Sequence, residues 1–232
     1  MSVVRPVLAD RFGRVATDLR VSLTDRCNLR CSYCMPAEGL AWLPREETLT
    51  DDEVVRLVRI AVERLGVTEV RFTGGEPLTR RGLLDIVAGA SRLRPRPRLS
   101  ITTNGIGLAR LAAPLRDAGL DRANVSLDTV NRARFAQLTR RDRLNDVLAG
   151  LEAAAAAGLT PVKLNSVLMR GVNDDDAPAL LRFALAHRYE LRFIEQMPLD
   201  AQHSWNRAAM VTAEEILGAL RTRFTLLPDP AE

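Results

Sequence analysis

Three cysteines lie within eight residues near the start of the chain, at Cys27, Cys31 and Cys34, and the chain has no other cysteine. Three thiolates can hold three irons of a four-iron cluster and leave the fourth iron open to another ligand. Zinc is one alternative, but it would need a fourth ligand, and the two histidines, His187 and His203, are far away in the sequence. A group of inert buried thiols is another. The spacing favours an iron-sulfur cluster with one open iron.

Length and composition limit what kind of protein this is. The chain has 232 residues, of which 47% are hydrophobic, so it can bury a sizeable core, and we expect one domain over residues 1–232. An odd number of cysteines so close together does not make a disulfide framework and fits a reducing compartment. The sequence has no apolar run of about 18 residues, so we expect a cytoplasmic protein with no membrane partner.

The chain is mildly basic, with 33 lysines and arginines against 29 acidic residues, which raises the possibility of a nucleic-acid partner. The strongest local run covers residues 92–98, where arginines alternate with other residues. Prolines interrupt this run and no aromatic residue lies in it for base stacking, so we interpret it as a solvated connector and expect no nucleic-acid partner. Lys163 is the only lysine, which makes it a weak pointer to function.

Hydrophobic periodicity predicts strands that alternate with helices along the whole chain. The expected strands are residues 19–24, 69–73, 99–103, 123–127, 162–168 and 191–197. The expected helices are residues 50–65, 82–91, 108–118, 144–157, 177–187 and 212–223. This order indicates right-handed βαβ units and a parallel sheet of the α/β class, either open and doubly wound or closed into a complete or partial barrel.

Five of the six expected strands alternate polar with apolar residues, although strands buried on both faces usually read as continuous apolar runs. If the apolar positions pack on the helices, the polar ones line an interior that holds a ligand. Arg20, Arg71 and Lys163 would then face this interior, and burying each charge without a partner would cost several kcal/mol. A polyanion such as a nucleoside triphosphate would resolve this. The alternative is that these side chains lie near strand ends and pair with local carboxylates.

A second motif, Gly74-Gly75-Glu76-Pro77, ends the second expected strand. By itself it would more often be an ordinary turn. Together with the cysteine spacing, and with an aromatic residue directly before Cys34, it resembles the signature of the radical S-adenosylmethionine superfamily. In that superfamily a reduced 4Fe-4S cluster cleaves S-adenosylmethionine to methionine and a 5′-deoxyadenosyl radical, and the Gly-Gly-Glu-Pro segment holds the methionine amino group.

Further segments resemble the GTP 3′,8-cyclase family (MoaA) of molybdenum cofactor biosynthesis. They begin at Asp18, Arg71, Thr102, Asn124, Val162 and Arg192, and together they span nearly the whole chain. The resemblance implies a partial (β/α)6 barrel of parallel strands with outer helices. It implies one 4Fe-4S cluster on the three cysteines and conversion of GTP to (8S)-3′,8-cyclo-7,8-dihydroguanosine 5′-triphosphate. By position, it assigns GTP contacts to Arg20, Arg71, Thr102 and Lys163, and S-adenosylmethionine contacts to Tyr33, Gly75, Ser126 and Met197.

The same resemblance implies partners. These are an electron donor of the flavodoxin or ferredoxin type and cyclic pyranopterin monophosphate synthase as the next enzyme, and a homodimer is left open. The family's radical steps use the cluster and cofactor and need no side-chain nucleophile or acid-base pair. No further catalytic side chain is therefore expected.

The sequence departs from the family in one respect. Members carry a second three-cysteine cluster that touches the guanine and further arginines for the triphosphate, whereas this chain has no cysteine after Cys34. We expect a fragment of a longer protein. The alternatives are a shortened relative that binds without turnover, a radical enzyme acting on another substrate, and a zinc-stabilised nucleic-acid-binding domain.

Overall fold

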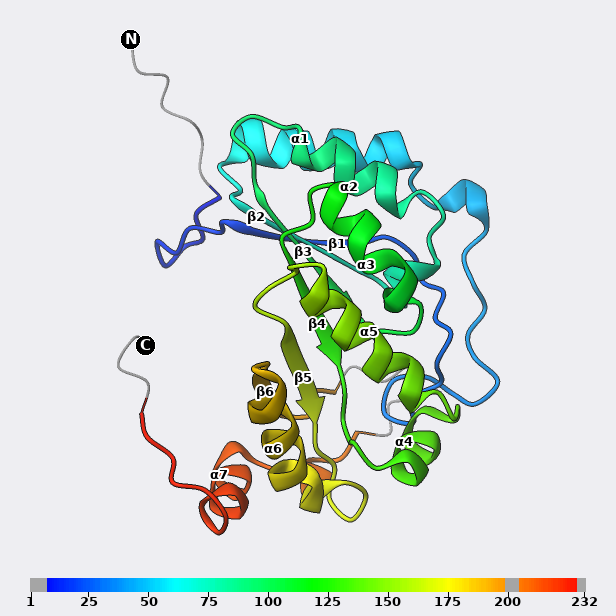
Figure 1. Ribbon diagram of the computed structural model, residues 1–232. Coiled ribbons are helices and arrows are strands. Elements are labelled where there is room, and N and C mark those ends of the chain that lie inside the picture. The colour runs from blue at the N-terminus through cyan, green and yellow to red at the C-terminus, as the bar shows by residue number, and fades with distance from the viewer. Residues whose placement is uncertain (1–7, 199–204, 229–232) are drawn as a thin grey trace. The chain divides into compact units, whose positions relative to one another are not determined.

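The computed structural model describes residues 8–198 and 205–228 (Figure 1). Six parallel strands alternate with helices, as the sequence predicts, and the order of the strands in the sheet is their order in the chain. The strands are β1 (Asp18–Ser22), β2 (Glu69–Thr73), β3 (Arg98–Thr103), β4 (Arg122–Ser126), β5 (Lys163–Val167) and β6 (Glu190–Ile194). The helices are α1 (Asp51–Leu65), α2 (Leu83–Ser91), α3 (Leu108–Asp117), α4 (Arg132–Thr139), α5 (Leu144–Ala156), α6 (Ala177–His187) and α7 (Ala213–Arg221).

The chain divides into two compact units. The first contains the described residues up to 28, with 41–125 and 145–162, and the second contains 29–40, 126–144 and the described residues from 163 onward. The cysteine loop between β1 and α1 therefore contributes Cys27 to the first unit and Cys31 and Cys34 to the second. A single domain over residues 1–232 stays a prediction.

In the first unit, β1, β2, β3 and β4 pair in parallel. Their buried side chains, such as Phe72 and Ile101, form the core with the helices. Helix α1 begins where the sequence predicts, because the Thr50 hydroxyl accepts a hydrogen bond from Glu53 N and the Glu53 carboxylate accepts one from Thr50 N. It ends at Gly66, whose φ of 78° suits a glycine C-cap.

In the second unit, β5 pairs in parallel with β6, and α6 packs on β6. Helix α4 is absent from the sequence prediction, which was wrong here because half of its eight residues are polar and only Phe135 and Leu138 are buried apolar side chains. Its start is fixed by Asn131, whose side-chain oxygen accepts a hydrogen bond from Arg134 N. In the part of the chain that the structure describes, no helix combines the length and apolarity needed to cross a membrane.

Candidate active site

The three cysteines lie in the loop that follows β1 and form no disulfide bond. Cys27 and Cys31 are half-buried and Cys34 is exposed. Cys34 N and Met35 N both donate to Cys31 O at 3.0 Å, which makes a tight turn of the segment between the last two cysteines. Although Cys34 is exposed as a residue, desolvation of its sulfur by the surrounding protein raises the pKa of the thiol.

Within the described residues, no three His, Cys, Asp or Glu side chains gather closely enough to hold a single metal ion. A four-iron cluster does not require this, since each thiolate binds its own iron. His187 stacks on Tyr189 and packs against Phe183, with ring centroids 5.4 and 4.5 Å apart, so it has a packing role. His203 lies outside the described residues.

Residues 30–35 of the cysteine loop are held by the end of α4 in the second unit. Arg30 N donates to Thr139 O at 3.0 Å, and Ser32 N donates to Leu138 O at 2.9 Å. These bonds satisfy carbonyl groups that a helix end otherwise leaves without a partner. Arg140, in the left-handed region at φ 55°, adds two more hydrogen bonds between the end of α4 and the cysteine loop. Its Nη1 donates to Arg30 O at 3.1 Å and to Met35 O at 3.0 Å.

Tyr33, the aromatic residue before Cys34, is anchored inside the second unit. Its hydroxyl donates to Oδ2 of Asp128 at 2.8 Å, and Val167 N donates to Oδ1 of the same carboxylate at 2.9 Å. Burial raises the pKa of Asp128 to about 6, against the hydrogen bonds, which lower it. Asn173 fixes the backbone around this pair, since its Nδ2 donates to Asp128 O at 2.9 Å and to Val167 O at 3.0 Å.

The Gly-Gly-Glu-Pro segment packs against the residues just before Cys27, inside the first unit. Gly75 N donates to Thr24 O and Glu76 N donates to Arg26 O, both at 2.7 Å. A Cβ atom on Gly75 would lie 2.4 Å from the carbonyl oxygens of Asp25 and Arg26, so only glycine fits. This close approach to the cysteine loop supports a binding role for the segment over an ordinary turn.

Glu76 is fully buried and organises the neighbouring strand end. Its carboxylate accepts hydrogen bonds from Thr103 Oγ1 and Asn104 N at 2.7 Å and from Leu78 N at 2.9 Å. Burial raises its pKa, although these bonds act to lower it. Asn104 in turn directs its Nδ2 to Asn28 Oδ1 at 2.7 Å and to Cys27 Sγ at 3.8 Å. A buried carboxylate is thus linked through one asparagine to a cysteine of the motif.

Two of the expected GTP contacts are neighbours on one sheet face. Arg20 on β1 is in register with Arg71 on β2, and Arg71 with Ser100 on β3. Residues in register on adjacent parallel strands point to the same face, about 4.8 Å apart. Arg20 is exposed and Arg71 half-buried, and Thr102 lies half-buried two residues beyond Ser100 on β3. The two arginine side chains therefore leave the same face of the sheet from neighbouring positions.

Lys163 differs from these arginines. It is in register with Glu190 on the neighbouring strand β6 and forms an ion pair with that carboxylate. For Lys163 the structure therefore shows the local pairing that the sequence left open as an alternative. Its side chain is only 17% exposed, whereas that of Glu190 is 53% exposed.

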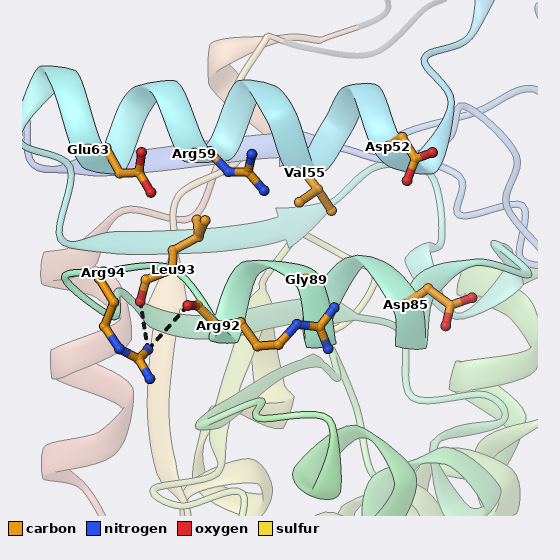
Figure 2. Close-up of a pocket in the computed structure, with 9 residues that line it drawn as sticks. All are labelled: Asp52, Val55, Arg59, Glu63, Asp85, Gly89, Arg92, Leu93 and Arg94. Atoms are coloured by element: carbon orange, nitrogen blue, oxygen red, sulfur yellow. Dashed lines mark hydrogen bonds between the residues drawn. The ribbon is translucent and has the colours of Figure 1, made fainter.

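A groove of about 610 Å³ lies between α1 and α2 and contains none of the expected site residues (Figure 2). Gly89 of α2 permits the approach of the helices, since a Cβ there would come within 2.8 Å of Val55 on α1. Acidic and basic side chains line the groove in equal number, namely Asp52, Glu63, Asp85, Arg59, Arg92 and Arg94. Mixed charge of this kind gives no preference for an anionic nucleotide.

The sequence profile described as Radical SAM superfamily matches residues 21–184, which include all three cysteines and the Gly-Gly-Glu-Pro segment. The chain belongs to the radical SAM superfamily.

Solved structures agree on the fold. Coproporphyrinogen III oxidase (HemN) from Escherichia coli aligns with 94% of this chain and 51% of its own at a TM-score of 0.60 and 15% identity. HydG, a maturase of the [FeFe]-hydrogenase, aligns with 88% of this chain and 48% of its own at a TM-score of 0.65 and 15% identity. The predicted partial barrel of six parallel strands is confirmed.

Curated relatives are much closer in sequence. The chain is 67% identical over 226 residues to a GTP 3′,8-cyclase of Streptomyces coelicolor, an alignment covering 97% of this chain and 66% of the relative. It is 64% identical over 224 residues to GTP 3′,8-cyclase 2 of Mycobacterium tuberculosis strain H37Rv, covering 97% of this chain and 62% of the relative. The chain thus spans slightly less than two thirds of the length of these relatives.

The residues of this radical SAM domain fit the cluster that the superfamily implies. The donor set is three thiols with no fourth protein ligand nearby in the sequence, and the glycine pair packs directly on the loop that carries Cys27. Of the expected S-adenosylmethionine contacts, Gly75 lies in the first unit, and Tyr33, Ser126 and Met197 lie in the second. Met197 is 54% exposed in the segment after β6, and Ser126 is half-buried at the end of β4. Their roles stay predictions.

Sequence reasoning missed the side chains behind the site. Asp128, Asn173 and Arg140 are not among the residues that the sequence predicts for the site. Asn104 lies in the segment that begins at Thr102, but nothing in the sequence links it to Cys27 or Glu76. The available signal is that Asp128 is a polar residue just after the end of β4, where a barrel keeps its site.

Proposed function

We propose that the chain is the radical S-adenosylmethionine part of a GTP 3′,8-cyclase, which converts GTP to (8S)-3′,8-cyclo-7,8-dihydroguanosine 5′-triphosphate in the first step of molybdopterin biosynthesis. The observation that carries the proposal is 67% identity to the Streptomyces coelicolor cyclase over 97% of this chain. The neighbouring positions of Arg20 and Arg71 on one sheet face support it, since two arginines suit a polyanionic ligand such as a triphosphate.

Cys27, Cys31 and Cys34 are the residues that would hold the 4Fe-4S cluster. When bound, the cluster and S-adenosylmethionine supply an electron and a 5′-deoxyadenosyl radical that takes a hydrogen atom from the substrate. The chain's own contribution is to bind and orient. Gly75 is exposed beside the cysteine loop, and we propose that Gly75, Tyr33, Ser126 and Met197 contact S-adenosylmethionine. The hydrogen bond from Tyr33 to Asp128 would fix the aromatic residue of this set.

For the substrate, we propose that Arg20, Arg71, Thr102 and Lys163 contact GTP. Arg20 and Arg71 lie in register on one face and would hold phosphate oxygens through charged hydrogen bonds. The Lys163 ammonium is already paired with Glu190, so it would share this carboxylate or exchange it for an oxygen of the nucleotide. Exchange is favourable where the new partner carries more negative charge than a single carboxylate.

The proposal includes the pathway partners. A carrier of the flavodoxin or ferredoxin type would reduce the cluster, and cyclic pyranopterin monophosphate synthase would consume the product. Homodimerisation is part of the same proposal.

Anaerobic equilibrium binding tests the substrate assignment. The reconstituted chain should bind GTP, and Arg20→Ala and Arg71→Ala should each weaken GTP binding by roughly ten-fold or more, the scale of a charged hydrogen bond. Arg92→Ala, which removes an exposed arginine of the α1–α2 groove, is the matched control and should bind GTP as the unmodified chain does. Binding of S-adenosylmethionine without any binding of GTP would contradict the assignment and favour another substrate.

A further inference from the structure

A third arginine lies in the same row of the sheet as Arg20 and Arg71, within the first unit. From Arg71 of β2 the row continues through Ser100 of β3 to Arg122, the first residue of β4. Residues in register on adjacent parallel strands leave the sheet on the same face. Arg122 is not among the residues that the sequence predicts for the site, yet it extends the row that holds two of the expected GTP contacts.

Positive charge on this face is concentrated in that row. Across the described strands β1 to β4, the face carries four arginines and two carboxylates, namely Arg20, Arg71, Arg98, Arg122, Asp18 and Glu69. Both carboxylates lie in the preceding row, where Asp18 and Glu69 are in register with Arg98. Within these strands, the row of Arg20, Arg71 and Arg122 therefore contains three cations and no carboxylate of its own.

The nearest carboxylate recorded for Arg122 holds it only weakly. Its Nη2 lies 3.9 Å from Oε2 of Glu69, which is beyond hydrogen-bond distance. The other oxygen of Glu69 accepts a hydrogen bond from Arg98, so this carboxylate already has a guanidinium partner. In the part of the chain that the structure describes, Nε of Arg122 is buried and has no hydrogen-bond partner. Leaving a buried donor of a charged group unbonded is unfavourable, so a ligand that supplies an acceptor would be bound favourably here.

The acidic residue next to Arg122 in the chain is engaged elsewhere. The carboxylate of Asp121 accepts hydrogen bonds from Arg96 at 2.8 Å and from Leu99 N at 2.7 Å. The side chain of Arg122 is 24% exposed, so a ligand on this face can reach it. Arg122 thus combines a charge that is weakly paired with an accessible position beside an expected substrate contact.

We propose that Arg122 is a further phosphate-binding residue of the substrate site, and that it favours nucleoside triphosphates over monophosphates. The inference rests on the proposed function, because it takes GTP as the ligand of Arg20 and Arg71. Three strand spacings separate Arg20 from Arg122, which is about 14 Å between Cα atoms. A chain of three phosphates can extend along such a row, whereas a single phosphate group would have to draw both end arginines inward. Each guanidinium would donate charged hydrogen bonds to phosphate oxygens.

Arg122→Gln tests this assignment by anaerobic equilibrium dialysis of the reconstituted chain. GTP and inorganic tripolyphosphate should each bind roughly ten-fold more weakly, the scale of a lost charged hydrogen bond. GMP should bind nearly as tightly as it does to the unmodified chain, so the preference for GTP over GMP falls. Arg122→Lys keeps the charge but not the planar pair of donors, and it should recover part of the loss.

Two further variants of the first unit serve as controls. Arg92→Gln removes an exposed arginine of the α1–α2 groove and should bind all three probes as the unmodified chain does. Glu69→Gln removes the carboxylate that lies 3.9 Å from Arg122, and tripolyphosphate should bind at least as tightly. Thermal unfolding of Arg122→Gln should occur at nearly the same temperature as that of the unmodified chain, because Arg122 has only this long contact with Glu69 to lose.

Several outcomes would overturn the inference. One is an equal loss of GTP and GMP binding in Arg122→Gln, or no loss of either. Another is an equal loss in Arg92→Gln, which would mean that net charge alone decides binding. Binding of tripolyphosphate without GTP by the unmodified chain would instead contradict the proposed function, and the tripolyphosphate comparison would still decide the role of Arg122. An unmodified chain that binds neither probe would contradict both.

Discussion

The hydroxyl of Tyr33 donates a hydrogen bond of 2.8 Å to Oδ2 of Asp128, so the aromatic side chain beside Cys34 is anchored to a buried carboxylate at the end of β4. The other carboxylate oxygen accepts from Val167 N on β5. One aspartate thus joins the cysteine loop, the residues after β4 and the end of β5 within the second unit. The burial of Asp128 makes the free energy of unfolding depend on pH.

Burial raises the pKa of Asp128 from 3.8 to about 6. The folded chain therefore holds a proton on this group at pH values where the unfolded chain has lost it. The resulting stabilisation is fully present below the unfolded pKa and is lost as pH rises through about 6, a difference of about 3 kcal/mol for a shift of this size.

Asp128→Asn removes this titration. Urea unfolding below pH 4 and above pH 6 should show the variant gaining about 3 kcal/mol relative to the unmodified chain as pH rises across this range. Tyr33→Phe is the companion variant, because it deletes a hydrogen bond that lowers the Asp128 pKa and should enlarge the loss in the otherwise unmodified chain. The opposite result is a difference in unfolding free energy, between Asp128→Asn and the unmodified chain, that is the same at both pH values. It would show that folding does not shift the pKa of Asp128.

Much of this arrangement follows from sequence, and the rest depends on tertiary contacts. The bounds of β2 and α6 match the prediction because regular alternation and a proline near the helix start mark them clearly. Strand β1 ends two residues before the predicted Thr24, where Thr24 O accepts a hydrogen bond from Gly75 N instead of from a neighbouring strand. The pairs Tyr33 with Asp128 and Asn104 with Cys27 join residues 95 and 77 positions apart, and no local pattern encodes such contacts.

Asn104 should tune the reduction potential of the bound cluster. Its Nδ2 is directed at Cys27 Sγ, and hydrogen bonds to cluster sulfurs stabilise the more negative, reduced state. Asn104→Ala should lower the potential by on the order of 40 mV, the one-electron equivalent of a hydrogen bond worth about 1 kcal/mol. Redox titration followed by electron paramagnetic resonance measures this. Asn206→Ala, which removes an asparagine that caps Arg207–Ala209, is the control, and a potential equal in both variants would argue against tuning by Asn104.

Gly75→Ala should damage the S-adenosylmethionine site through sterics. The added Cβ would lie 2.4 Å from two loop carbonyl oxygens, so the residues before Cys27 must move. We expect S-adenosylmethionine affinity to fall at least roughly ten-fold, as for loss of a buried polar contact. Gly218→Ala in α7 is the control, because no atom lies within 4 Å of the added Cβ. Isothermal titration calorimetry should find that Gly218→Ala binds S-adenosylmethionine as tightly as the unmodified chain does. Equally tight binding by Gly75→Ala would contradict the proposed role of Gly75 in this site.

Lys163→Ala should weaken GTP binding by about 1.5 to 3 kcal/mol, the scale of a hydrogen bond to a charged group, and leave S-adenosylmethionine binding nearly unchanged. Glu190→Gln separates phosphate binding from support of the fold. It releases the ammonium from its carboxylate partner, so GTP should bind at least as tightly as to the unmodified chain. Weaker GTP binding in both variants, together with lower thermal stability, would mean that the ion pair itself holds β5 to β6.

The central claim is that these 232 residues hold one four-iron cluster and cleave S-adenosylmethionine, while the cysteines that the cyclase family adds at the guanine are absent after Cys34. Hydrogen abstraction needs reacting atoms held about 3 to 3.5 Å apart, and misplacement by about 1 Å can cost around a hundred-fold. Without the guanine anchor, only the triphosphate end of GTP would be fixed.

Anaerobic product chromatography of the reconstituted, dithionite-reduced chain with S-adenosylmethionine and GTP is the direct test. We predict slow formation of 5′-deoxyadenosine, its loss in Cys31→Ala, and little or no 3′,8-cyclised nucleotide, whereas absence of 5′-deoxyadenosine from a fully loaded chain would contradict the account.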